Sequence, residues 1–453
     1  MILPNYFLAD LPPEATLSPQ MIQEACQTLK RNREQYLATR STPQMVKLIS
    51  ELAENWLQPD YPFRQFALEH GPAATGFAHA TLVRGLDAFF QELTRENLHT
   101  LVVHELGHAH RLDEMCATAA EARLQRAAMV RGPELLVHIA SGNIPNPTLL
   151  SIILGLLTRS AQFVKCSRGA SFLPRLFAHS LYEADAKLAS CLEIAEWRGG
   201  DIALEDPLFA EASCVTATGS DETLAAVQQR LPKSVRFLGY GHRVSFGYIT
   251  RGVLSGFGVK KIVVRAAEDV ISWNQLGCLS PHLIYVETGG SVSPDQFAEK
   301  LAEELSRCEG GEPRGQVSVE VAATISSRRD FYRVRASASS ETQMWSSDAS
   351  TAWTVVYEAD ARFQLSCLNR FIYVKAVASL DEALNYADAV RGQVSTVGIA
   401  AQDDEAQALS TRLGRWGVTR ICPLGQMQNP PLTWCHDGRP ALGDLVEWIG
   451  WEQ

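Results

Sequence analysis

A single thiol at a glycine turn is the most reactive group that the sequence displays. In the stretch 271–287, Cys278 directly follows Gly277, with Pro281 and the apolar run 283–286 behind it. This order predicts a helix end, a turn and a strand, and such turns are where reactive side chains are usually displayed. We therefore take Cys278 as the candidate nucleophile; on this stretch alone, the alternative is a small apolar residue packed at a turn.

A second pattern that could do chemistry runs from His104 to His108 and matches HExxH. On a helix this spacing places two imidazoles on one face beside a carboxylate, as zinc hydrolases require. A zincin also needs a third ligand, but no HxxGxxH extension follows, and Asp113, Glu114 and Glu121 stand at no suitable spacing. Because so short a pattern arises by chance, we interpret the match as accidental and expect no metal.

Two strand ends could bind a phosphorylated cofactor. The turn Thr218-Gly219-Ser220 lies between a predicted strand and a predicted helix, where free backbone N–H groups and the helix dipole favour an anion. Lys165 ends another predicted strand and could reach a ribose or a phosphate. The alternatives are that Ser220 only caps its helix and that Lys165 is an ordinary lysine with a buried stem.

The elements that must position these residues alternate between strands and helices. After predicted helices over 18–57 and 63–96, the segment 134–165 reads as a strand, a Gly/Asn/Pro turn, a helix and a second strand. Such alternation predicts a mainly parallel, doubly wound sheet that binds ligands at the carboxyl ends of its strands. Further strands are expected at 192–197, 213–217, 235–238, 283–286, 317–325, 352–357, 371–377, 395–400 and 417–422, and further helices at 173–187, 222–230, 293–307 and 380–387.

Length and composition limit the class of protein. With 453 residues, the chain is long enough for two or three domains. Its 46% hydrophobic and 20% charged residues are typical of a soluble globular enzyme, and its formal net charge of −10 argues against a nucleic acid or an anionic membrane as partner. Ten scattered cysteines without a CxxC pair indicate reduced thiols, and no apolar stretch approaches the ~20 residues that a membrane span needs. We therefore expect a cytoplasmic protein.

The motifs, taken in order, resemble those of the LuxC family of long-chain acyl-CoA reductases, within the aldehyde dehydrogenase superfamily. Gly142-Asn143-Ile144-Pro145 is similar to the superfamily's Asn-Phe-Pro turn, and Lys165 to its ribose-contacting lysine. The turn Thr218-Gly219-Ser220 resembles the turn over the cofactor pyrophosphate. The run Gln275-Leu-Gly-Cys278 with Ser280-Pro281 resembles the nucleophile loop of the LuxC branch. The resemblance covers 133–383 and, more weakly, the rest of the chain.

The resemblance implies an aldehyde dehydrogenase-like α/β fold. Residues 1–242 would form N-terminal helices and the NAD(P)-binding domain, and 243–425 the catalytic domain with the nucleophile. Residues 426–453 would pack on the first domain or on a partner subunit. We also expect a homo-oligomer.

The resemblance also assigns roles to residues. Cys278 would attack an acyl thioester, and the Asn143 amide would help to hold the oxyanion. Lys165, Arg168, Thr218, Gly219 and Ser220 would bind the cofactor. Arg168 stands where NAD-preferring relatives often carry an acidic residue, so a guanidinium there favours the 2′-phosphate of NADPH.

One departure from the superfamily concerns water. Where hydrolytic aldehyde dehydrogenases carry a general-base glutamate, this chain has Gly239-Tyr240-Gly241-His242. An acyl-cysteine here would meet hydride or a thiol rather than activated water. His242 is a candidate proton donor, but a structural role is the more frequent one for a histidine, and we leave it outside the catalytic set.

The predicted function is therefore NADPH-dependent reduction of an acyl thioester to the aldehyde through an acyl-cysteine. The acyl donor would be a long-chain acyl-CoA, an acyl-carrier protein or another acyl-protein. The alternatives are a CoA-acylating aldehyde dehydrogenase that works in the oxidative direction, a zinc hydrolase, and a binding protein that has lost its chemistry.

Overall fold

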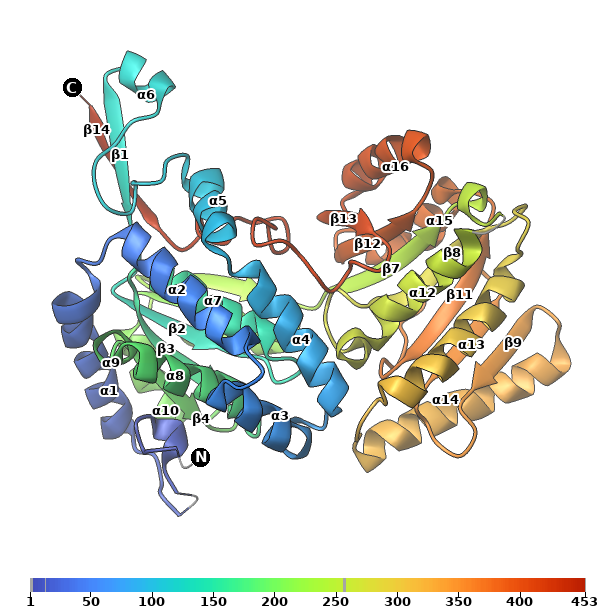
Figure 1. Cartoon of the computed structure of the whole chain (residues 1–453), viewed down its shortest axis with the longest axis horizontal. Coiled ribbons are helices and arrows are strands. Elements are labelled where there is room, and N and C mark those ends of the chain that lie inside the picture. The colour runs from blue at the N-terminus through green and yellow to red at the C-terminus, as the bar shows by residue number, and fades with distance from the viewer. Residues whose placement is uncertain (1–2, 13, 256–257, 453) are drawn as a thin grey trace.

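The computed structural model describes residues 3–12, 14–255 and 258–452, which form two lobes and a projecting two-stranded arm (Figure 1). Each lobe is built on one sheet. The chain leaves the first sheet at Tyr240 and enters the second at Val244, so residues 241–243 connect the two.

The first lobe carries a five-stranded parallel sheet in the order β4-β3-β2-β5-β6. Its strands alternate with helices, as the sequence predicts. The elements are β2 (Leu135–Ile139), α7 (Asn146–Leu157), β3 (Ala161–Cys166), α8 (Phe172–Ala184), α9 (Ala186–Ala189), β4 (Leu192–Glu196), α10 (Ile202–Glu211), β5 (Cys214–Thr218), α11 (Asp221–Arg230) and β6 (Arg236–Tyr240).

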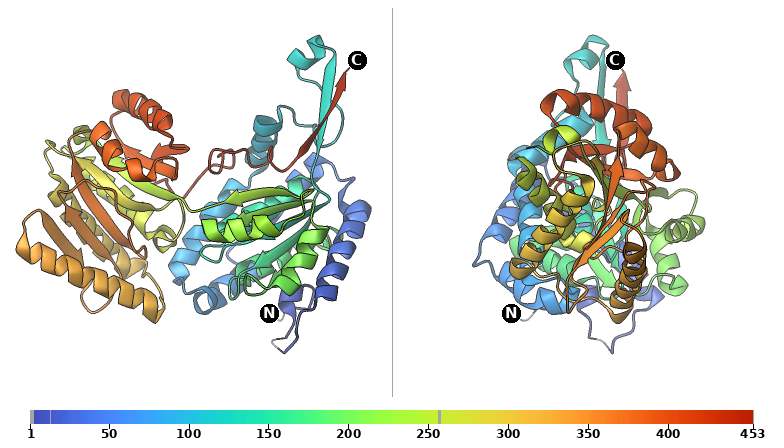
Figure 2. Two further views of the ribbon diagram at one scale, coloured as in Figure 1. Left: turned by 180° about the vertical axis from the view of Figure 1, so that it is seen from behind. Right: turned by 90° about the vertical axis from the view of Figure 1, so that its right-hand side faces the viewer.

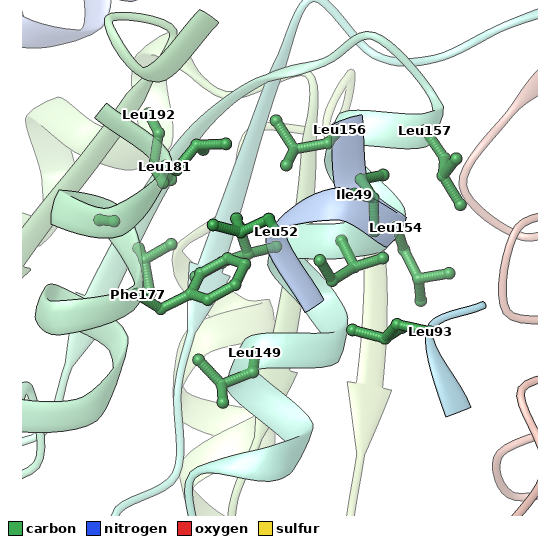
Figure 3. Packing of buried hydrophobic residues seen from close by; sticks show 14 of the residues in the cluster. Ile49, Leu52, Leu93, Leu149, Leu154, Leu156, Leu157, Phe177, Leu181 and Leu192 are labelled. Atoms are coloured by element: carbon green, nitrogen blue, oxygen red, sulfur yellow. The ribbon is translucent and has the colours of Figure 1, made fainter. Parts of the chain in front are cut away.

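Both faces of this sheet are buried, since successive side chains of a strand point to opposite faces. On one face, Val137 and Phe163 pack against helices α1 and α10. On the other, Leu136 and Val164 pack against α7 and α8, which are covered in turn by a further helical layer. Figure 3 shows Ile49 and Leu52 of that layer beside Leu149 and Leu154 of α7. The N-terminal helices are α1 (Pro19–Asn32), α2 (Thr42–Leu57), α3 (Pro62–Thr75), α4 (His79–Glu92), α5 (Arg95–Leu106) and the short α6 (Ala119–Arg123).

The second lobe carries a seven-stranded sheet in the order β13-β12-β7-β8-β11-β10-β9, in which only β9 is antiparallel to its neighbour. Helices α12 and α13 cover one face, and α14, α15 and α16 cover the other. The elements are β7 (Val244–Ile249), α12 (Gly258–Ile271), β8 (Pro281–Glu287), α13 (Pro294–Gly311), α14 (Val319–Ala338), β9 (Thr342–Ser346), β10 (Thr354–Glu358), β11 (Phe371–Val377), α15 (Leu380–Tyr386), β12 (Val394–Ala400), α16 (Asp403–Trp416) and β13 (Arg420–Pro423).

One strand prediction in this lobe is wrong. The segment 317–325, which its valines and isoleucine marked as a strand, begins helix α14. The Ser318 side chain accepts the N–H of Val321 (3.3 Å) and so caps the helix. Ile325, Arg329 and Tyr332 are the buried residues of α14, and their spacing of three and four is helical.

The C-terminal segment returns to the first lobe. Strand β14 (Glu447–Glu452) pairs antiparallel with β1 (Arg126–Arg131), and together they form the projecting arm at whose end the C-terminus lies (Figure 2). The Arg236 guanidinium donates to the carbonyl of Val446 (2.9 Å), which fixes the base of the arm to β6. Within the described residues, no helix combines the length and apolar character that a membrane crossing requires.

Candidate active site

The predicted nucleophile lies on a loop with an unusual backbone. Between α12 and β8, three consecutive residues, Trp273, Asn274 and Gln275, have φ of 48°, 53° and 65°. Residues other than glycine rarely adopt this left-handed conformation, which costs of order 1–3 kcal/mol at each position. The loop must therefore be held by contacts elsewhere in the protein.

Buried hydrogen bonds supply those contacts. The Asn274 amide donates to the carbonyl of Arg314 (2.6 Å) and accepts from the Arg370 guanidinium (3.1 Å). The Gln275 amide donates to the carbonyls of Pro281 (2.7 Å) and Phe371 (2.9 Å). These partners fix both ends of the turn that precedes Cys278.

The loop also contacts the first lobe. The Trp273 ring lies so close to Gly85 of α4 that a Cβ there would come within 2.0 Å of it, and it makes an edge contact with Phe77 (5.1 Å between ring centres). Arg84 and Glu312 form an ion pair across the same junction (2.6 Å). The nucleophile loop, residues 272–280, is thus positioned by both lobes.

Cys278 opens into a cavity of about 170 Å³ between the lobes. It is the exposed residue among the described cysteines, the others being buried or half-buried. Although the side chain is accessible from the cavity, burial of the sulfur, with a smaller contribution from the Asp437 carboxylate, raises the pKa of the thiol to about 12. The thiol is therefore protonated at neutral pH, so its use as a nucleophile requires a base.

Four segments supply most of the cavity wall, and most of the side chains they contribute are apolar. They are helix α4, helix α7 with the residue Ile144 before it, the loop that carries Cys278 and the C-terminal loop that follows β13; the ends of β5 and β6 add Thr218 and Tyr240. The apolar lining residues are Ala88, Phe89, Ile144, Pro147, Leu150, Leu154, Trp273, Leu279, Pro430, Pro431, Leu432, Trp434 and Ala441.

The other predicted site residues lie at the carboxyl edge of the first sheet. Strand β2 pairs with β3 and with β5, so the turns after these three parallel strands are neighbours. The turns after β2 and β3 contact each other, since the Ser167 hydroxyl donates to the carbonyl of Ala140 (3.2 Å). Of the predicted residues in these turns, Thr218 lines the Cys278 cavity.

The turn after β2 carries two asparagines in different positions. Asn143 is exposed and is not among the lining residues, whereas Asn146, the first residue of α7, lines the cavity. The Asn146 side-chain oxygen is buried and has no hydrogen-bond partner among the described residues. Asn146, three residues beyond the predicted Asn143, therefore lines the cavity and has an unused hydrogen-bond acceptor.

Lys165 and Arg168 occupy contrasting positions. Lys165 is 2% exposed, and its Nζ lies 5.9 Å from the centre of the Trp197 ring. Burial lowers the pKa of the Lys165 ammonium group. Arg168 is exposed, and no carboxylate pairs with it in the part of the chain that the structure describes. The nearby Glu196 carboxylate instead accepts the N–H groups of Gly169 (2.7 Å) and Ser171 (3.2 Å).

Ser220 has the role of a helix cap. Its side chain accepts the N–H of Thr223 (3.3 Å) at the start of α11. Gly219 donates its N–H to the carbonyl of Tyr240 (3.2 Å). A Cβ at Gly219 would touch only Thr223, so the outer side of this turn is open.

The HExxH residues do not form a helical pair. Helix α5 ends at Leu106, and Gly107, at φ 74°, turns the chain away before His108. The Glu105 carboxylate accepts the N–H groups of Ala441 (2.9 Å) and Gly443 (3.0 Å), which anchors the C-terminal segment. No group of three His, Cys, Asp or Glu side chains suited to a metal ion occurs within the described residues.

The sequence alone did not single out the C-terminal loop as part of the cavity. His436 lines it together with Trp434 and with Tyr240 of β6. The available signal was local: Trp434-Cys435-His436-Asp437-Gly438 places a histidine beside a carboxylate in a loop. Nothing in the spacing indicated that this loop faces Cys278, about 160 residues earlier.

The two lobes, the arm and the interlobe site define the aldehyde dehydrogenase fold. An NAD-dependent benzaldehyde dehydrogenase from Corynebacterium glutamicum matches with a TM-score of 0.71 and 12% identity, over 99% of this chain and 94% of that one. An NADP-dependent glyceraldehyde-3-phosphate dehydrogenase from Bacillus halodurans C-125, complexed with NADP, matches with a TM-score of 0.72 and 15% identity, over 96% and 91%. A bifunctional proline utilization A protein matches with a TM-score of 0.73 and 16% identity; 98% of this chain spans only 46% of that longer protein. These likenesses concern the fold.

The chain belongs to the LuxC acyl-CoA reductase family, whose model matches residues 37–448. A long-chain acyl-protein thioester reductase of Aliivibrio fischeri is 22% identical over 423 residues, which are 90% of this chain and 82% of that protein. Long-chain acyl-protein thioester reductase 2 of Photobacterium leiognathi is 22% identical over 365 residues, or 80% and 72%. The reductase of Photorhabdus luminescens is 25% identical over 369 residues, or 80% and 71%.

Proposed function

We propose that this protein reduces an acyl thioester to the aldehyde with NADPH, through an acyl group carried on Cys278. The observation that carries the proposal is an accessible thiol that lines a largely apolar cavity, in a chain of the acyl-CoA reductase family. In this proposal residues 1–242 bind the cofactor, 243–425 carry the nucleophile, and 426–453 close the cavity and pack on the first lobe.

The cavity walls suit the acyl chain. Leu150 and Leu154 of α7, Phe89 of α4 and Leu432 of the C-terminal loop offer apolar surface on different sides. An acyl chain buried there would leave water, and the gain is about 0.8 kcal/mol for each CH₂ group. This favours a long-chain thioester; the donor thiol would belong to coenzyme A or to a protein.

The residues at the sheet edge fit a nicotinamide dinucleotide. The buried Lys165 Nζ has no ion pair among the described residues and could donate to ribose hydroxyls. The exposed Arg168 guanidinium suits a 2′-phosphate, which favours NADPH. The open turn at Gly219 and Ser220 lies at the positive end of α11, where a phosphate is favoured. When bound, this cofactor would supply the hydride.

The chain's own residues would do the rest. The Cys278 sulfur attacks the thioester carbonyl, the bond to the donor sulfur breaks, and the acyl group stays on Cys278. The Asn143 amide and the Cys278 backbone N–H stabilise the oxyanion, each by about 3 kcal/mol. Once the acyl carbon has been reduced, its bond to the Cys278 sulfur breaks and the aldehyde leaves.

The carboxylates of the cavity offer little to activate water. Glu92 is the carboxylate among the described lining residues. Burial raises the pKa of its carboxyl group, and the backbone of Leu432 opposes this shift. Glu92 lies about two turns of α4 beyond Gly85, the residue against which the nucleophile loop packs. The acyl-enzyme should therefore persist until it is reduced.

Aldehyde release tests the proposal. Acyl-CoA and acyl-carrier protein substrates of increasing chain length are incubated with NADPH or NADH, and aldehyde is measured. We expect aldehyde from long-chain thioesters with NADPH. If aldehyde, CoA and NADP⁺ instead give acyl-CoA efficiently while reduction is negligible, the oxidative direction is the function. The absence of both reactions contradicts the proposal.

A further inference from the structure

We propose that His436 is the acid–base partner of Cys278. It accepts the thiol proton as the sulfur attacks and returns that proton to the departing donor thiolate. This inference rests on the proposed function, because it concerns the same thiol. It supplies the base that the protonated Cys278 thiol requires.

His436 is the histidine among the described residues that line the cavity of Cys278. Two other histidines, His282 and His242, lie near Cys278 in the chain or in the fold, but neither lines the cavity. His282 is buried, and its Nδ1 accepts the N–H of Ser366 (3.2 Å). His242 is exposed at the end of β6 and does not line the cavity. Position in the cavity therefore favours His436.

The His436 ring is held in place by aromatic neighbours. It stacks on Tyr240 with ring centres 4.5 Å apart and planes 14° from parallel, and it lies 4.7 Å from the Trp434 ring. The Arg439 guanidinium covers the Tyr240 ring (4.7 Å). A fixed imidazole is what proton transfer to and from a thiol requires.

Asp437 adds a carboxylate to this arrangement. Its Oδ1 lies 4.0 Å from the His436 Nε2, is buried, and has no hydrogen-bond partner among the described residues. Its Oδ2 lies 3.1 Å from the Arg243 Nε. Asp437 raises the pKa of Cys278 and Arg243 lowers it, and the neighbouring His436 lines the same cavity as Cys278.

The charges around His436 favour its neutral form. Burial lowers the pKa of His436 below 6.5, Asp437 opposes this, and Arg439 and Arg243 add to it. Two further titratable groups line the same cavity, Tyr240 and Cys278; burial raises the pKa values of both, so both are neutral at pH 7. Asp444 pairs with Arg439 (3.7 Å). At neutral pH the imidazole is therefore free to accept the thiol proton.

The proton balance closes within the acylation step. The S–H bond of Cys278 breaks as the C–S bond to the acyl carbon forms, and the proton moves to His436. The bond from the acyl carbon to the donor sulfur then breaks, and the donor thiolate takes the proton from His436. No oxidant or reductant is consumed in this step.

The experiment measures acylation of Cys278 by acyl-CoA without nicotinamide, as a function of pH, in the full chain. In the wild type we expect a rate that is constant above the pKa of His436 and falls tenfold per pH unit below it. His436→Gln should be at least 100-fold slower at pH 7, and its rate should rise with pH towards the pKa of the thiol. His242→Gln should keep the wild-type profile.

Asp437→Asn provides a second variant that retains the imidazole. Because Asp437 raises the pKa of His436, its loss should move the acid limb of the profile to lower pH. A merely structural role for the loop would lower the rate without moving that limb. If His436→Gln keeps the wild-type pH profile of acylation, the inference is wrong. It is also wrong if His242→Gln loses that profile.

Alkylation of Cys278 by iodoacetamide, followed by mass spectrometry of its peptide, separates the two proposals. If acyl-CoA leaves no label on the wild type, the proposed function fails. The alkylation profile still decides the inference, since alkylation uses the same thiol proton: dependence on His436 supports it, and independence contradicts it.

Discussion

The two halves of the candidate site are held in different ways. At the edge of the five-stranded sheet, the turns rest on contacts within a turn, such as the Ser220 cap on Thr223, or with the end of a neighbouring strand, such as the bond from Gly169 to Glu196, 27 positions away. The nucleophile loop instead rests on partners far along the chain. Asn274 forms hydrogen bonds with Arg314 and Arg370, which lie 40 and 96 positions further along the chain. Gln275 forms one with Phe371, which lies 96 positions further along.

This difference predicts different responses to substitution. A change in a local turn should alter what that turn binds and little else. A change in the network under the nucleophile loop should destabilise the fold and displace Cys278 together, because the left-handed residues 273–275 depend on it.

The largest effect is expected for Arg370→Ala. The Arg370 guanidinium is 1% exposed, pairs with Glu309 (3.0 Å) and donates to Asn274. Its loss should lower the free energy of unfolding by about 3 kcal/mol, the low end for a broken buried pair because Glu309 is 27% exposed. Urea denaturation measures this. Arg362→Ala, which removes an exposed pair with Asp360, is the matched control and should cost less than about 1 kcal/mol. Equal losses of unfolding free energy in Arg370→Ala and Arg362→Ala would show that the nucleophile loop does not depend on this buried network.

The next effect concerns the turn after β2. Asn143→Ala should slow acylation of Cys278 by about 100-fold if its amide stabilises the oxyanion, with little change in stability. Rapid-mixing acylation assays give the rate. Asn146→Ala is the informative companion, because Asn146 lines the cavity. A larger loss in that variant would assign the oxyanion to Asn146.

A smaller effect is expected at Arg168. Arg168→Glu should weaken NADPH binding about tenfold, the loss of one partly exposed charged hydrogen bond, and should change NADH binding less. Fluorescence titration with each nucleotide measures both dissociation constants. Arg198→Glu, a surface change in a neighbouring turn, is the control. Unchanged selectivity in Arg168→Glu would remove Arg168 from the cofactor site.

The smallest effect is expected at the HExxH residues. His104→Ala and His108→Ala should each change the free energy of unfolding by about 0.5 kcal/mol or less, as surface substitutions do. A chelator should leave reductase activity unchanged. Stoichiometric, tightly bound zinc in the purified protein would contradict this.

The sequence predicts the first sheet well because local pattern decides it. Each buried parallel strand is a short apolar run between helices, and the turns that end β2, β3 and β5 carry recognisable residues. The same reasoning fails at 317–325, where the Ser318 cap and helical packing outweigh the strand preference of valine.

Features that depend on distant partners could not be predicted in this way. The arm joins Arg126 to Glu452 across the length of the chain. The left-handed turn at Trp273 follows no local rule, since no glycine marks it. His436 lines the cavity on a loop that distant residues anchor: Glu105 binds residues 441–443, and Arg236 holds the base of the arm.

The most direct test of the central claim is to trap the acyl-enzyme. Labelled long-chain acyl-CoA, without reduced nicotinamide, should leave label that neutral hydroxylamine releases and that NADPH discharges as aldehyde. Cys278→Ala should abolish labelling. Cys435→Ala should not, because Cys435 does not line the cavity. Label that survives the loss of Cys278 would place the nucleophile elsewhere and contradict the account.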